Sequence, residues 1–168
     1  EDDVTLQPDF MATALAAITA VPATWDVIHL TTNAKNPSHQ VKSLGDRWLV
    51  RHSRLPAGSG ALIFSRRGAE KFVAQGKRTR TFDLELRFAW VRGLDLYGVY
   101  PPPALQGERF PSVIGRHCDL DPLMIARWQP RLTSRLYGWL YVKSKLGFAG
   151  TFDCWGQSMR QRMGEVWG

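Results

Sequence analysis

The sequence has few of the features that mark a metal-binding, disulfide-linked or membrane-spanning protein. It holds two cysteines in 168 residues, Cys118 and Cys154, and neither stands at a metal-ligand spacing from the four histidines. So sparse a pair indicates reduced, structural thiols more than a disulfide framework, with a single bridge as the alternative. No run reaches the roughly 18 apolar residues that a membrane span needs. These absences predict a cytoplasmic segment.

The sequence also lacks an internal repeat, a long low-complexity tract and a recognised nucleic-acid-binding motif. What it has is positive charge, because 22 Lys and Arg residues against 15 Asp and Glu residues give a net charge of +7. This charge predicts an acidic partner and leaves open whether that partner is nucleic acid, anionic lipid or a phosphorylated ligand. With 44% hydrophobic residues, the chain is long enough for one domain with a substantial core.

Helix and strand patterns alternate through the first hundred residues and predict an α/β layer fold. An Ala-rich helix is expected over residues 10–18, before Pro22, and the polar residues 31–43 indicate a loop. Ser65 is placed to cap a helix over residues 66–75. The predicted strands, which are rich in β-branched and aromatic residues, are 25–30, 47–51, 61–64 and 96–100.

Two carboxylates open a further predicted helix. Asp83 and Glu85 lie in its first turn, where negative charge meets the positive end of the helix dipole. Leu84, Phe88 and Val91 stand at helical spacing and are expected to face the core. From the pattern alone, the simplest role for Asp83 is to cap this helix.

The last 42 residues, which begin at Arg127, differ in character from the rest. From Arg127 onward seven basic residues stand against two acidic ones, and Pro130 suits the first turn of a helix. Four apolar residues then share one helix face: Leu132, Leu136, Trp139 and Leu140. Basic residues beside such a stripe are typical of a helix on an anionic membrane surface, and equally of a helix packed on its own domain.

Three consecutive acids, Glu1, Asp2 and Asp3, stand immediately before the apolar Val4. An acidic cluster at the end of a strand offers the hard oxygen ligands that suit Mn²⁺ or Mg²⁺. In an enzyme that transfers a sugar from a nucleotide diphosphate, a metal held at such a cluster neutralises the charge that builds on the diphosphate as it leaves. Three solvated acids are the simpler interpretation of so short a motif.

Several short segments stand in a particular order over residues 1–114. They are residues 1–4, 25–28, 58–72, 82–84 and 97–103, followed by Gln106 and residues 112–114. Together these segments resemble glycosyltransferase family 25, the bacterial lipopolysaccharide glycosyltransferases related to the collagen galactosyltransferases. The chain departs from the family pattern at Leu62 and Thr81, where a Tyr and a Pro are common.

This resemblance implies a GT-A type nucleotide-sugar fold whose nucleotide-binding half would precede residue 1. Residues 1–115 would form the C-terminal part of the transferase domain, and residues 116–168 a basic, partly helical tail that reaches anionic lipid at the inner membrane. The implied reaction is an inverting, metal-dependent transfer of a sugar, with UDP-galactose as the expected donor and a lipooligosaccharide as acceptor. The alternative is a non-catalytic module that binds carbohydrate or nucleic acid.

The resemblance also implies roles for particular residues. Asp3 and Glu1 would hold Mn²⁺ (or Mg²⁺), and Asp2 would contact the donor. Asp83 is the candidate general base that takes the proton of the acceptor hydroxyl, with Glu85 as the substitute. Glycine at a turn lets backbone approach a ligand closely, so donor contacts are expected at Gly58, Ser59 and Gly60, with an ordinary connecting loop as the alternative.

Overall fold

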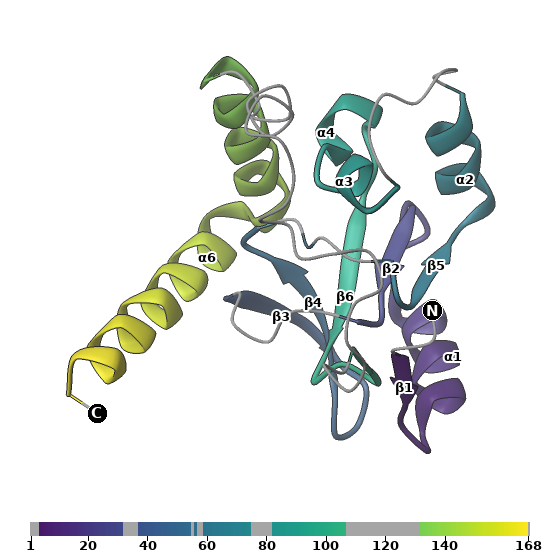
Figure 1. Ribbon diagram of the computed structural model, residues 1–168, viewed down its shortest axis with the longest axis horizontal. Helices are drawn as coiled ribbons and strands as arrows, with labels where there is room; N and C mark the ends of the chain where they lie inside the picture. The colour runs from purple at the N-terminus through teal and green to yellow at the C-terminus, as the bar shows by residue number, and fades with distance from the viewer. Residues whose placement is uncertain are drawn as a thin grey trace, which may run out of the picture.

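The computed structural model of the chain describes residues 4–31, 37–54, 56, 59–74, 82–106 and 132–167. Within these ranges a mixed five-stranded sheet carries helices on both faces, and a long C-terminal helix runs along one side (Figure 1). The predicted α/β class is therefore confirmed.

The sheet has the strand order β3-β4-β6-β2-β5, with β2 and β6 parallel and the other neighbours antiparallel. A separate antiparallel pair joins β1 to β7. The strands are β1 (Val4–Leu6), β2 (Val27–His29), β3 (Ser38–Ser43), β4 (Trp48–His52), β5 (Leu62–Phe64), β6 (Leu96–Tyr100) and β7 (Ala104–Gln106).

One face of the sheet is covered by α1 (Phe10–Ala20). Ala14 and Ala17 of α1 are buried in one cluster with Ile28 and Val99 of the central strands. Their small side chains let the helix axis come close to the sheet, which is why an Ala-rich segment serves here. The helix ends before Pro22, as predicted.

The other face is covered by α2 (Arg66–Val73), α3 (Phe82–Leu86) and α4 (Ala89–Arg92). The predicted cap of α2 is confirmed, because the hydroxyl of Ser65 accepts a 2.9 Å hydrogen bond from the backbone N–H of Gly68. The segment expected as one helix forms two short ones. Val91 is consequently 53% exposed, so its predicted core position was wrong, whereas Phe88 is buried.

The prediction of a loop over residues 31–43 was wrong where it includes β3. Ser38–Ser43 form an edge strand that pairs antiparallel with β4, with a bulge between Gln40 and Lys42. The polar residues suit this position because four of the six β3 side chains are exposed. The strand is held by its hairpin partner β4 and by α6. The composition of residues 38–43 alone gives no sign of these contacts.

The C-terminal helix α6 (Leu132–Trp167) is broken at Gly147, whose φ of 68° and ψ of −175° are non-helical. Val142, Leu146 and Cys154 form a small buried cluster on its inner side. Cys154 is a free thiol, as predicted, and burial raises its pKa to about 11. None of the helices in the described part of the chain, α6 included, is both long and apolar enough to cross a membrane.

Candidate functional site

The parallel strands β2 and β6 end at the same edge of the sheet, and two of the predicted donor-binding residues, Ser59 and Gly60, lie at this edge. The backbone N–H of Leu30 donates to the carbonyl of Ala61 (2.9 Å), and the N–H of Ala104 donates to the carbonyl of Leu30 (3.3 Å). Ser59 and Gly60 directly precede Ala61. The structure therefore places both of them where the central strands end.

The pair β1–β7 brings the N-terminal segment toward this edge. Leu6 pairs with Ala104, and the backbone N–H of Gln7 donates to the carbonyl of Pro103 (2.9 Å). The residues that precede β1 are the predicted metal ligands Glu1 and Asp3 and the predicted donor contact Asp2. All three lie outside the described residues, as does Gly58. In the rest of the chain that the structure describes, no group of three His, Cys, Asp or Glu side chains is placed to hold a metal.

The predicted catalytic carboxylates belong to α3, near the opposite edge of the sheet (Figure 1). Glu85 is 5% exposed and forms a 2.7 Å ion pair with Arg92, whose guanidinium also donates to the carbonyl of Phe72 (2.6 Å). Glu85 is thus part of the packing between α2, α3 and α4. Asp83 lies in α3, and its side chain is outside the described part of the structure.

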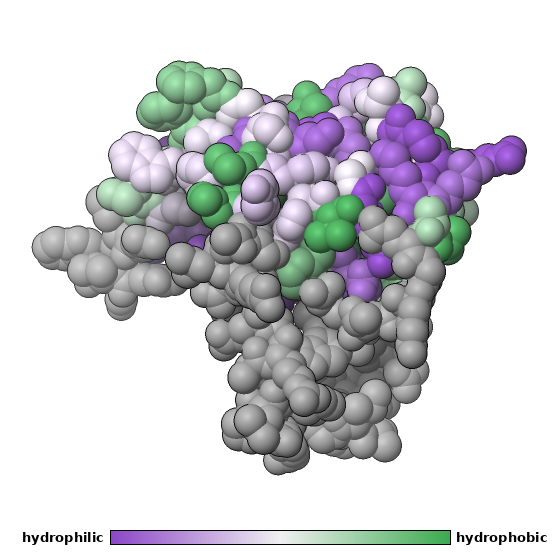
Figure 2. Space-filling model, turned by 90° about the horizontal axis from the view of Figure 1, so that it is seen from above, coloured by the Kyte–Doolittle hydropathy of each residue, from purple (hydrophilic) through white to green (hydrophobic). Residues whose placement is uncertain are grey.

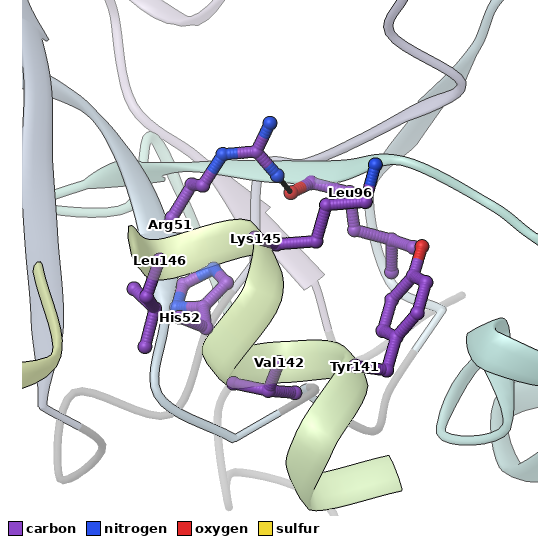
Figure 3. Close-up of a pocket in the computed structure, with 7 residues that line it drawn as sticks. All are labelled: Arg51, His52, Leu96, Tyr141, Val142, Lys145 and Leu146. Atoms are coloured by element: carbon purple, nitrogen blue, oxygen red, sulfur yellow. Dashed lines mark hydrogen bonds between the residues drawn. The ribbon is translucent and has the colours of Figure 1, made fainter. Parts of the chain in front are cut away.

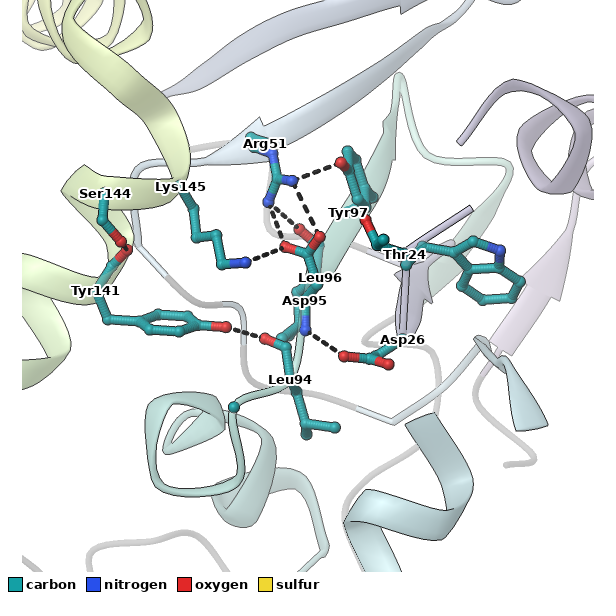
Figure 4. A network of polar contacts seen from close by, with 12 residues as sticks. Thr24, Asp26, Arg51, Leu94, Asp95, Leu96, Tyr97, Tyr141, Ser144 and Lys145 are labelled. Atoms are coloured by element: carbon teal, nitrogen blue, oxygen red, sulfur yellow. Dashed lines mark hydrogen bonds and ion pairs between the residues drawn. The ribbon is translucent and has the colours of Figure 1, made fainter. Parts of the chain in front are cut away.

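A connected polar network occupies the edge where β2 and β6 begin (Figure 4). Asp26 directly precedes β2 and is fully buried, and Asp95 directly precedes β6 and is 6% exposed. The backbone N–H of Asp95 donates to the carboxylate of Asp26 (2.8 Å). Sequence analysis missed both residues, although an acid standing directly before each buried strand was a usable signal.

Four cations surround these two carboxylates. Arg67 Nε and Lys71 Nζ lie 2.8 and 2.7 Å from the oxygens of Asp26. Arg51 Nη1 and Lys145 Nζ lie 2.8 and 3.2 Å from Oδ1 of Asp95. The network thereby ties α2, β4 and α6 to the starts of the two parallel strands and leaves a surplus of positive charge.

The ionisation of the network suits a structural role. Burial alone would raise the pKa of Asp26, but hydrogen bonds from Lys71, the Asp95 amide and Arg67 outweigh it and hold the pKa below its ordinary value. Burial raises the pKa of Tyr97, and that of Tyr141 still further, so both phenols stay neutral. An ionised carboxylate between cations and two neutral phenols provide no proton acceptor poised near pH 7.

A small pocket lies beside this network, between α6 and the strands β4 and β6 (Figure 3). Arg51 and Lys145 line it and are both held by Asp95. The hydroxyl of Tyr141, from the same helix, donates to the carbonyl of Leu94. The pocket is therefore part of the junction that fixes α6 to the sheet.

Two histidines, His29 and His52, are buried in the sheet. Their rings are 6.4 Å apart and nearly perpendicular. Burial lowers the pKa of His29 to about 3 and that of His52 to about 4, so both are neutral. Gly98 makes room for His52, because a Cβ at this position would lie 2.1 Å from Nε2 of that ring.

No protein-family model, curated protein or solved structure matches this chain. The geometry divides the candidate residues into two groups. Ser59 and Gly60 lie at the edge where the parallel strands end, while Asp83 and Glu85 belong to a helix near the edge where they begin. The structure does not bring these two groups together.

Proposed function

We propose that this chain belongs to a metal-dependent inverting glycosyltransferase that transfers a sugar, expected to be galactose from UDP-galactose, to a lipooligosaccharide. The observation that supports the proposal is the position of Ser59, Gly60 and β1 at the edge where β2 and β6 end. In open α/β sheets, ligands bind outside the carboxyl ends of parallel strands. Two separate segments of the family resemblance, residues 58–72 and 97–103, thus have described residues at the edge where such a sheet binds its ligand.

The proposed fold is the C-terminal part of a GT-A type domain. A parallel central pair flanked by antiparallel strands is compatible with it. The nucleotide-binding half would precede β1, whose partner β7 already ties the N-terminal segment to the end of β2. The acceptor would be reached at the cytoplasmic face of the inner membrane.

The chemistry of the proposed ligand residues suits the proposed metal. Glu1 and Asp3 are carboxylates, the hard ligands that Mn²⁺ and Mg²⁺ prefer, and the metal would offset charge on the leaving diphosphate. Asp2 would contact the donor. Gly60, which has no side chain, lets the diphosphate approach the backbone next to Ser59.

The resemblance implies Asp83 as the general base, with Glu85 as the substitute. A base must lie within hydrogen-bond reach of the acceptor hydroxyl, but α3 lies near the edge where β2 and β6 begin, away from Ser59 and Gly60. Glu85 is moreover buried in its ion pair with Arg92. The proposal therefore assigns the donor side of the site and leaves the general base unassigned.

Calorimetric titration with UDP tests the proposal on this chain joined to the nucleotide-binding half that the proposal places before β1. We expect UDP to bind with Mn²⁺ present and not with EDTA, and Asp3→Asn to weaken binding at least tenfold. The matched control is Asp46→Asn, because Asp46 is an exposed acid in the β3–β4 turn, and it should bind UDP like the unmodified chain. UDP binding that ignores Mn²⁺ would contradict the metal site. A chain that binds saccharide or oligonucleotide but no UDP would be the non-catalytic module.

A further inference from the structure

The two sides of α6 beyond Gly147 differ sharply. Its inner side packs on the edge strand β3, where Asp153 lies 3.1 Å from Nδ1 of His39 and the amide of Gln157 exchanges hydrogen bonds with the backbone of Ser38. Gly150 sits against the ring of His39. This side of the helix is therefore covered by contacts with β3.

The outer side of the same segment carries a stripe of large apolar residues. Phe148, Phe152, Trp155 and Met159 are 83, 55, 61 and 41% exposed. Their spacing of four, three and four residues keeps them on one helix face. The rings of Phe148 and Phe152 are 4.7 Å apart, and those of Phe152 and Trp155 are 6.5 Å apart. We call these four residues the aromatic stripe.

A second apolar patch lies on α6 before Gly147. It consists of four residues that are 47 to 66% exposed: Leu136, Tyr137, Trp139 and Leu140. The ammonium group of Lys143 lies 5.7 Å from the centre of the Trp139 ring, so a cation accompanies the patch. In Figure 2 the surface over α6 is pale and green, whereas the surface over α2 is purple.

The charges on α6 favour an anionic partner. Among the α6 side chains that the structure describes, the one acid is Asp153, which is turned toward β3. Lys143 and the exposed Arg160 accompany the apolar residues. Across residues 132–167 the helix holds five Lys and Arg residues against two acids.

We propose that the outer face of α6 docks on the surface of a bilayer that contains anionic lipid. Trp and Tyr rings favour the headgroup region, and Lys and Arg beside them attract anionic headgroups. A helix with exposed aromatic rings can insert these rings into the membrane–water interface, and this binding needs no preformed groove on the partner. This inference rests on α6 and holds whatever chemistry the rest of the chain performs.

Sedimentation with vesicles tests the proposal on the full chain. We expect it to bind vesicles of phosphatidylcholine with 30% phosphatidylglycerol, and to bind pure phosphatidylcholine at least tenfold more weakly. The double variant Phe152→Ser with Trp155→Ser should lose at least tenfold in binding to the anionic vesicles. Its control is Met11→Ser with Leu15→Ser, because both residues are exposed on α1 and their replacement removes apolar surface elsewhere.

A charge variant gives an independent readout. Lys143→Gln with Arg160→Gln should weaken binding to anionic vesicles severalfold, while Arg66→Gln with Arg87→Gln, which removes the same charge near α2 and α3, should not. Unchanged binding in the Phe152 and Trp155 variant would overturn the proposal. So would a dimer, seen by sedimentation equilibrium without vesicles, that this variant turns into a monomer, because a second copy would then cover the stripe. Vesicle binding is measured without UDP, so its failure is separate from failure of the proposed transfer.

Discussion

The backbone N–H of Asp95 donates a 2.8 Å hydrogen bond to the carboxylate of Asp26, which stands 69 positions earlier in the chain. Each acid directly precedes a parallel strand, so this bond aligns the starts of β2 and β6. The cations on each carboxylate extend the arrangement to neighbouring elements. The buried network thus sets the geometry of the central pair β2 and β6, and Ser59 and Gly60 lie beside the other end of β2.

Asp26→Asn should destabilise the protein by about 2 to 4 kcal/mol. The amide keeps the shape of the carboxylate but leaves Arg67 and Lys71 without their charged partner. Both cations are partly exposed, at 45 and 34%, so water recovers some of the loss. Urea unfolding followed by circular dichroism measures the change.

The control for this prediction is Glu70→Gln. Glu70 forms an exposed ion pair with Arg66, and exposed pairs contribute less than about 1 kcal/mol. A loss in Asp26→Asn that is no larger than in this control would show that the network does not clamp the strands.

Gly98→Ala should cost about 1 to 3 kcal/mol of unfolding free energy. The new Cβ would lie 2.1 Å from Nε2 of His52, inside a packed sheet where the ring has little room to move. Adding His52→Ala to the variant should remove the clash, so the double variant should lose less than the sum of the single changes. Additive losses in urea unfolding would mean that the two residues are not in contact.

Stability should fall as the pH falls below about 6.5, the ordinary pKa of histidine. The folded pKa values of His29 and His52 are lowered to about 3 and about 4, so between these values and 6.5 the unfolded chain binds more protons. The stabilisation is complete above pH 6.5 and is lost toward pH 4. Between pH 7.5 and 5.5 we expect a loss of about 1 to 1.5 kcal/mol for each histidine.

Urea unfolding at pH 7.5, 6.5 and 5.5 checks this pH dependence. The variant His52→Gln cannot take up the proton and should show about half of the decline. A stability that is flat or rises toward pH 5.5 would contradict a neutral, buried pair at His29 and His52.

Gly147→Ala should cost about 1 to 3 kcal/mol, because φ near +68° with ψ near 180° is a conformation that essentially only glycine adopts. Nothing lies within 4 Å of the added Cβ, so the cost comes from the backbone alone. Gly156→Ala, in the same helix and also in open space, should instead raise stability by up to about 1 kcal/mol. Opposite shifts in melting temperature would confirm the break, and equal shifts would contradict it.

Local chemistry was sufficient to predict several elements. Ser65 capped α2 as expected, because a side-chain oxygen that satisfies an orphan N–H acts within one helical turn. Pro22 limited α1, and the strand Leu96–Tyr100 has the predicted bounds. Each of these outcomes depends on residues a few positions apart.

Features that depend on distant residues were not predicted. β3 looks like a loop because its polar side chains face outward, and its partners come from β4 and α6. Asp26 and Asp95 form one network only because the parallel pairing of β2 and β6 brings them together. Of the candidate site, the structure places Ser59 and Gly60 at the edge that the proposal requires, while the roles of Glu1, Asp2 and Asp3 stay predictions.

The amide side chain of Gln157 has a consequence for where the protein can be shortened. It accepts from the N–H of Ser38 at 3.2 Å and donates to the carbonyl of Ser38 at 2.9 Å, as a neighbouring strand would. A version cut before Gln157 would leave this pair of backbone groups facing solvent on an edge strand, which is a template for pairing with another chain. Expression designs that keep the second half of α6 should therefore give monodisperse protein, and shorter ones should aggregate.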